Sequence, residues 1–145
     1  MTKKIVLIFE HLPLTILVCL LGSYFQIDLI SIIAILFFGW LIDVDHLFDY
    51  LIFCIRDKTK PNLYAFLDSK YFKLNKKIYL PLHSWEICSV FLILFLISFQ
   101  VNFLLIFLSY SLHLIQDQLT NNVKYHTYFL FIRAKYNFNL YQFCK

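Results

Sequence analysis

Four long apolar runs constrain the fold of this chain more than any other feature. They cover about residues 5–22, 29–53, 83–99 and 103–119. A helix needs roughly 20 mostly apolar residues to cross the hydrocarbon core of a bilayer, and each run approaches or exceeds that length. The runs therefore predict an all-α integral membrane bundle of about four transmembrane helices, within a single membrane domain that spans residues 1–145.

The composition favours lipid as the environment of this bundle. The chain is 61% apolar and only 15% charged, whereas a typical soluble domain is about half apolar and about a quarter charged. A soluble chain of 145 residues could not hide this much apolar surface. Lys3 and Lys4 before the first run are typical of a signal peptide, but Glu10 and His11 interrupt the run, so we expect a retained span.

The basic residues predict the orientation of the spans. All thirteen lie in the N-terminus, in the segment 56–82 or in the tail 120–145, and the loops 23–28 and 100–102 contain none. Because Lys and Arg favour the cytoplasmic side, we expect a multi-pass protein of the inner or plasma membrane with both termini cytoplasmic. Aromatic residues alternate with bases in 56–82 and 120–145, which predicts cytoplasmic interfacial amphipathic segments. Bases beside spans indicate lipid headgroups as partners and no nucleic acid.

Ionisable residues interrupt the apolar runs. An ionisable group within a membrane helix costs several kcal/mol unless it is paired or liganded. On a continuous helix over 29–53, Asp45, His46 and Asp49 would lie within about 100° of one face, and Asp43 about 60° beyond His46. His83 and Glu86 share a face, as do His113 and Asp117. These groups would meet at similar depth near the cytoplasmic surface.

So many carboxylates would repel one another, and a bound divalent cation would resolve the repulsion. Mixed histidine and carboxylate ligands suit zinc first, and also manganese or iron, with one or two ions. The predicted metal ligands are His11, Asp43, Asp45, His46, His83, His113 and Asp117. Asp49 and Glu86 are the predicted catalytic residues, each a candidate general base if it is not a ligand. A metal-free polar cluster remains an alternative.

The order of these residues resembles a known family. His11 is followed by the D-x-D-H element Asp43–His46, by His83-Ser84 at the head of a helix, and by the H-x-x-x-D-x-L-T element His113–Thr120. This pattern resembles the YdjM-like membrane-bound metal-dependent hydrolases of bacteria. The resemblance implies a small bundle with a metal site that faces the cytoplasm, and hydrolysis as its activity. Glu10 stands where the family usually has Gly, and Ile42 where it has Pro.

Two functions follow from these patterns. The first is a membrane-embedded metal-dependent hydrolase with a cytoplasm-facing His/Asp site, acting on a lipid-linked ester or phosphoester, so that lipid is both environment and substrate. The alternative is a non-catalytic protein that binds or handles metal in the membrane. A purely structural polar core is a third reading. The sequence does not indicate an oligomeric state.

Overall fold

The computed structural model describes residues 10–67 and 71–144, and their regular structure is helical. The described residues form no β-strand, only two isolated bridges, Lys77 with Asn139 and Val123 with Cys144. The predicted all-α fold is therefore confirmed. Residues 5–9, the beginning of the first predicted span, lie outside the described ranges.

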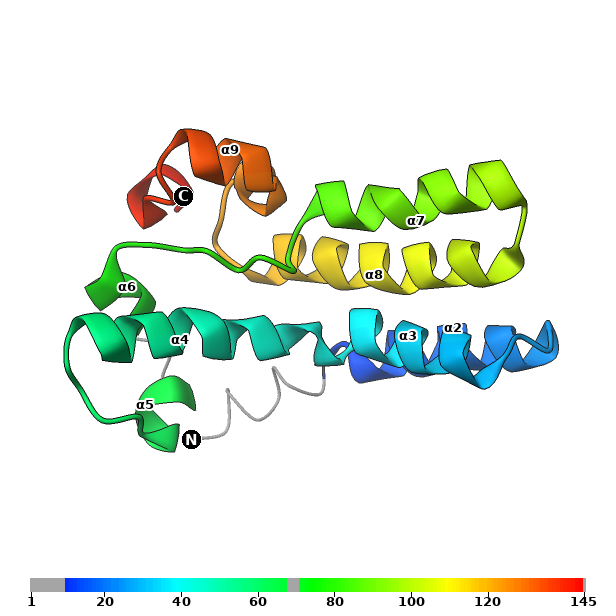
Figure 1. The fold of residues 1–145 in the computed structure, drawn as a ribbon, viewed down its shortest axis with the longest axis horizontal. Helices are drawn as coiled ribbons and strands as arrows, with labels where there is room; N and C mark the ends of the chain where they lie inside the picture. Colours follow the sequence, from blue (N-terminus) through cyan, green and yellow to red (C-terminus); the bar gives the residue numbers. More distant parts are fainter. Residues whose placement is uncertain (1–9, 68–70, 145) are drawn as a thin grey trace.

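Four helices form one half of the molecule (Figure 1), and they correspond to the four apolar runs: α2 (Leu12–Tyr24), α3 (Leu29–Gly39), α7 (Trp85–Ser98) and α8 (Val101–Thr120). Helix α8 packs against the other three. Val18 of α2, Ile35 of α3 and Leu105 of α8 are buried together in this half. Because α8 touches every neighbour, it is the central element of the bundle.

Short-range signals in the sequence set the ends of these helices. Asp28 caps α3 by accepting a hydrogen bond from the Ser31 amide at 2.9 Å, and Ser84 caps α7 by accepting one from the Ile87 amide. Asp and Ser are favoured at this position because their oxygens satisfy amides that the helix leaves unpaired. Phe99 ends α7 in the left-handed region with φ 54°. The turn into α8 follows directly.

The second apolar run differs from its prediction, because residues 29–53 do not form one continuous helix. Helix α3 ends at Gly39, a 3₁₀ turn η1 (Leu41–Val44) follows, and α4 (Asp45–Arg56) leaves at an angle of 61°. Side chains of α2 and α8 pack directly against Gly39: a Cβ there would lie 2.6 Å from Thr15 Oγ1 and would also collide with Ser109 Oγ. The helical-face geometry expected for Asp43 relative to α4 is therefore wrong.

The other half of the molecule is built from α4 and from short elements of the middle loop and tail. These are α5 (Leu63–Leu67), α6 (Tyr71–Asn75), η2 (Tyr125–Tyr128), α9 (Leu130–Lys135) and η3 (Leu140–Gln142). Ile78 and Leu80 of the loop are buried against Leu140 and Phe143 of the tail. The segments 56–82 and 120–145, predicted as interfacial, thus pack against each other in their described parts.

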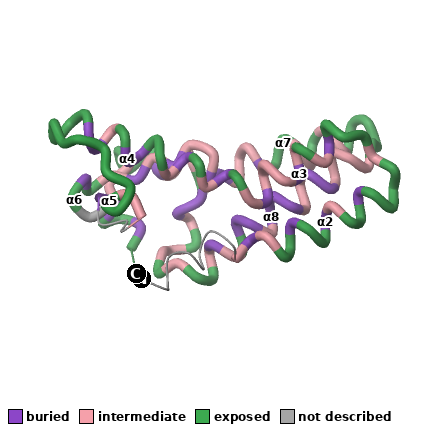
Figure 2. The backbone as a smooth tube through the Cα atoms, turned by 90° about the horizontal axis from the view of Figure 1, so that it is seen from below, coloured by how far each residue is buried: buried purple, intermediate pink, exposed green. Residues whose placement is uncertain are grey.

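The helices differ from simple membrane spans. Among the described residues, no single helix is both long and apolar enough to cross a bilayer; only α3 taken with the bent segment Leu41–Arg56 reaches that size. Helices α2 and α7 are apolar but shorter. Exposed residues recur along both (Figure 2), among them Leu20, 62% exposed, and Ile97, 74% exposed. The membrane location of the bundle stays a prediction.

Candidate metal centre

Four side chains meet where the two halves of the molecule join. His113 and Asp117 lie one turn apart on the buried face of α8, Asp43 comes from η1, and His83 comes from the loop before α7. One ligand atom from each lies within 4.8 Å of the others. His83 and His113 are at most 1% exposed. The structure therefore contains a buried His/Asp cluster that could hold a metal ion.

The distances within this cluster are short and similar. His83 Nε2 lies 3.2 Å from Asp43 Oδ1, 3.2 Å from Asp117 Oδ2 and 3.2 Å from His113 Nε2. His113 Nε2 lies 3.6 Å from Asp43 Oδ1 and 3.7 Å from Asp117 Oδ2. Ligand atoms about 2.0–2.1 Å from a tetrahedral zinc lie about 3.3 Å from one another. These five separations approximate five edges of such a tetrahedron.

The second nitrogen of each histidine supports this arrangement. His83 Nδ1 lies 3.0 Å from Asp45 Oδ2, and His113 Nδ1 lies 3.1 Å from the carbonyl oxygen of Gly39. Both partners can only accept, so each neutral ring carries its proton on Nδ1 and leaves a lone pair on Nε2. Metal-binding histidines are normally held in this way by a carboxylate or a carbonyl. Two lone pairs that face each other need a proton or a cation between them.

A second group of possible ligands contains Asp45, His46 and His83. It shares His83 with the first group, and a neutral imidazole offers a lone pair on only one of its nitrogens. The two groups therefore compete for His83. Asp45 also accepts the amides of Leu82 and His83, at 3.0 and 3.2 Å, so it holds the loop and orients the ring. His46 Nε2 lies 3.6 Å from Asp43 Oδ1, at the half-exposed edge of the cluster.

His11, the remaining predicted ligand, lies beside the cluster. Its ring stacks on His113 with centroids 3.8 Å apart, and its Nε2 lies 3.3 Å from Asp117 Oδ1. Asp117 thus has one oxygen towards His11 and the other towards His83. All seven predicted ligands gather in one region, and four of them form the compact group.

The two predicted catalytic carboxylates lie outside both groups of ligands. Asp49 is fully buried in α4 and accepts the amides of Tyr79 and Leu80, at 2.9 and 3.4 Å to Oδ2. Glu86 in the first turn of α7 accepts the amides of Leu130 and Phe131, at 2.9 and 3.0 Å. Both carboxylates therefore bind backbone amides of neighbouring segments. Their assignment as general bases stays a prediction.

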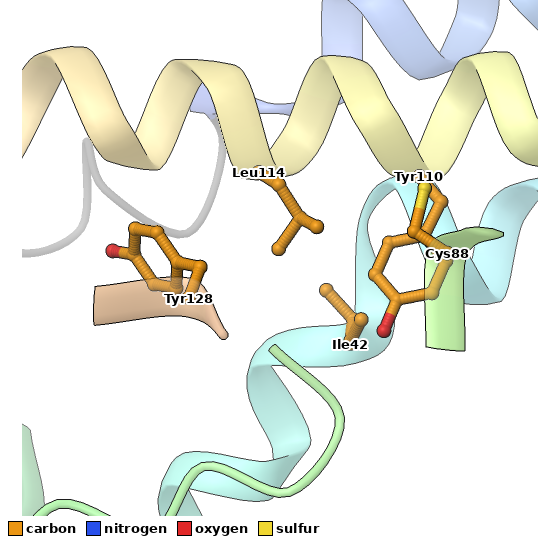
Figure 3. Packing of buried hydrophobic residues seen from close by; sticks show 5 residues of the cluster. All are labelled: Ile42, Cys88, Tyr110, Leu114 and Tyr128. Atoms are coloured by element: carbon orange, nitrogen blue, oxygen red, sulfur yellow. The ribbon is translucent and has the colours of Figure 1, made fainter. Parts of the chain in front are cut away.

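An apolar cluster lies next to the cluster of ligands. Figure 3 shows its five buried members: Ile42, Cys88, Tyr110, Leu114 and Tyr128. The ring of Tyr128 lies 6.1 Å from that of His83, and the hydroxyl of Tyr110 donates to the carbonyl of Leu82. Apolar walls exclude water and strengthen electrostatic interactions with any bound ion.

Arg133 is the important residue that the sequence analysis did not single out. It is fully buried in α9, and its guanidinium donates to the carbonyls of Leu80 and His83, at 2.8 and 2.6 Å. Burial lowers the pKa of Arg133, and the charges of Asp45, Glu86 and Asp49 act in the opposite direction; the side chain remains charged. The sequence feature that could have indicated its burial is its position directly after the apolar stretch 128–132.

No protein-family model, curated protein or solved structure matches this chain. The likeness to the YdjM-like hydrolases therefore rests on the ordered residues from His11 to Thr120, and membership of that family stays a prediction.

Proposed function

We propose that this chain is a membrane-embedded hydrolase that depends on one divalent transition metal, zinc first, held by Asp43, His83, His113 and Asp117. The observation that carries the proposal is the set of near-equal separations, 3.2–3.7 Å, that join the ligand atoms of the two histidines to each other and to the carboxylates. Two carboxylates and two neutral imidazoles also balance the charge of a divalent ion.

The chemistry would take place at the half-exposed edge of the cluster. The Asp43 side chain is 32% exposed, whereas those of His83 and Asp117 are at most 10% exposed. A metal held by these four residues would have to take water as a fifth ligand at this edge; it would then lower the pKa of that water and stabilise charge on the attacked group. Asp43 and His46 line this edge and lie within reach of each other, so they are placed to accept a proton from water or to orient it.

A lipid-linked ester or phosphoester is the proposed class of substrate. Around the edge formed by Asp43 and His46, the same segment exposes large apolar side chains: Leu41, Val44, Leu47 and Phe48, each 41–54% exposed. An amphiphile could place its acyl or prenyl part against these side chains and its polar linkage at the metal. Exposed apolar residues on α2 and α7 support burial of that half in lipid.

The first experiment measures the metal. Protein purified in detergent without chelators is expected to contain about one transition-metal ion per chain, because the four ligands enclose a single position. His113→Ala and the milder Asp117→Asn should lose most of it, and the matched control His126→Ala should keep it, since His126 lies in η2 outside both ligand groups. Wild-type protein without stoichiometric metal would contradict the proposal.

The second experiment separates the hydrolase from a non-catalytic metal protein. One observation favours that alternative: four protein ligands can fill all positions of a tetrahedral ion, as in structural zinc sites. Metal-loaded protein is incubated with vesicles of phospholipids and polyprenyl phosphates, and the products are identified by mass spectrometry. Turnover that is lost in Asp117→Asn supports the hydrolase. If neither the wild-type protein nor Asp117→Asn gives new products, the non-catalytic alternative is supported.

The proposed topology is tested by labelling cysteines. Cys19, Cys54 and Cys88 are replaced by Ala, which leaves the exposed Cys144 as the only thiol. A second variant also replaces Cys144 by Ala and carries Gln26→Cys in the loop between α2 and α3. A membrane-impermeant maleimide should label Gln26→Cys on intact cells and Cys144 only after lysis. Labelling of both, or the reverse pattern, contradicts the orientation.

A further inference from the structure

The segment 79–84 carries His83 into the metal centre without regular secondary structure. Leu80 has a φ of 37°, in the left-handed region that a residue with a side chain rarely adopts. Four amides of this segment donate to carboxylates of α4: Asp49 accepts from Tyr79 and Leu80, and Asp45 accepts from Leu82 and His83. The His83 amide also donates to the Leu80 carbonyl, and the Ser84 amide donates to the Leu82 carbonyl. Side chains of α4 thus bind four of the backbone amides of this segment.

Arg133 binds three backbone carbonyls of the same segment. Its Nη1 donates to Tyr79 and Leu80, and its Nη2 donates to His83 itself at 2.6 Å. A fourth carbonyl, that of Leu82, accepts from the hydroxyl of Tyr110. The planar guanidinium suits this task because its donors have fixed directions, whereas a lysine ammonium could not reach three carbonyls with the same geometry.

The tail that carries Arg133 is itself attached near the same loop. Glu86, three residues after His83, accepts the amides of Leu130 and Phe131 at the start of α9, and α9 packs against η2. Phe143 of the tail is fully buried beside Leu80. The position of the guanidinium is therefore fixed by several contacts, and any displacement of α9 would be passed to the backbone of His83.

We propose that Arg133 is the positioning residue of the metal centre: from the C-terminal tail it fixes the backbone of His83, so that Nε2 meets His113 Nε2 at the spacing a metal requires. This inference rests on the proposed metal centre. It assigns a role to the tail, which contributes no ligand to the compact group. Outer partners of metal-binding histidines typically change metal affinity by about 10–100-fold.

The test uses the full-length protein in detergent, with Co²⁺ as the probe. Arg133→Gln is expected to weaken Co²⁺ binding at least tenfold and to change the visible absorption of the bound ion, because His83 moves out of its position. Arg133→Lys, which keeps the charge, should recover part of the affinity. Arg56→Gln is the matched control: Arg56 also donates to a backbone carbonyl, that of Asn75, but away from His83.

Each result decides the proposal. Wild-type affinity and absorption in both Arg133 variants would overturn it, and so would global loss of helical structure in both, which would make Arg133 a general stability residue. If wild-type protein binds neither Co²⁺ nor Zn²⁺, the proposed function fails instead. Hydrogen exchange then tests the positioning alone: Arg133→Lys should speed the exchange of backbone amides in 79–84 and leave exchange in α8 unchanged. Exchange in 79–84 at the wild-type rate would overturn the proposed role of Arg133.

Discussion

The two histidines that face each other at the metal centre are held by different kinds of structure. His113 lies in the middle of the 20-residue α8, where helix packing fixes its backbone and the Gly39 carbonyl fixes its ring. His83 lies in a loop whose backbone is held by Asp45, Asp49 and Arg133. We call α8 with His113 the packed side and the loop with His83 the hydrogen-bonded side. The packed side should be sensitive to added side-chain volume and less sensitive to loss of a hydrogen bond. The hydrogen-bonded side should be most sensitive to loss of a hydrogen bond.

The largest expected effect is on the hydrogen-bonded side. Asp49→Ala leaves the amides of Tyr79 and Leu80 without this acceptor, and each unsatisfied amide costs about 1–3 kcal/mol, so the loss of stability should be about 2–6 kcal/mol. Thermal unfolding in detergent, followed by circular dichroism, measures it. Metal affinity should fall as well, because the loop carries His83.

Two further variants sharpen this prediction. Asp57→Ala, at the exposed end of α4, removes a carboxylate that pairs with the neighbouring Arg56 at the surface, and should leave the unfolding temperature nearly unchanged. Asp49→Asn keeps one acceptor oxygen and should be intermediate. An Asp49→Asn protein with wild-type stability and metal content but no turnover would instead support the prediction of Asp49 as general base.

The second effect tests the packed side by adding one methyl group. Gly39→Ala places a Cβ 2.6 Å from Thr15 Oγ1, so α2, α3 and α8 must separate, and such overpacking costs about 1–3 kcal/mol. The Gly39 carbonyl should move with the helix and weaken the hold on His113 Nδ1. Unfolding temperature and Co²⁺ affinity should therefore both fall.

Gly22→Ala is the matched control for this change. Gly22 is also a buried helical glycine, but the atoms nearest its added Cβ are the flexible ends of Ile27 and Ile32 side chains, at 2.7 and 3.0 Å. These can rotate away, so Gly22→Ala should cost less than Gly39→Ala and leave metal affinity unchanged. Equal losses in the two variants would show that the close approach at Gly39 has no special role.

The sequence predicted the helical class and indicated which ionisable residues would gather, because both depend on local composition. Apolar runs became α2, α3, α7 and α8, and the ionisable residues that interrupt those runs converged on one region. The bend after Gly39 could not be predicted from the apolar run alone, because Gly39 lies where Thr15 and Ser109 of two other helices pack against it. That bend places Asp43 among the ligands and leaves Asp45 to orient His83.

The different roles of Asp43 and Asp45 also could not be predicted from the sequence. Asp43 and Asp45 are two residues apart and chemically identical, yet only the tertiary position of the 79–84 loop makes Asp45 an acceptor of its amides. Arg133 lies 50 residues from His83 in the sequence, and its role follows from the packing of the tail, which no local pattern encodes.

The smallest expected effect is at Tyr110, where the two sides meet. Its hydroxyl, on the packed helix α8, donates to the Leu82 carbonyl on the hydrogen-bonded loop. That carbonyl also accepts the amide of Ser84 at 2.9 Å, so Tyr110→Phe leaves it one partner and should cost about 1 kcal/mol, with little change in metal affinity. The exposed Tyr64 provides the control Tyr64→Phe, which should have no effect on thermal unfolding. If Tyr110→Phe instead lowers Co²⁺ affinity as strongly as Arg133→Gln does, then α8 positions both histidines, and the distinction between a packed and a hydrogen-bonded ligand does not hold.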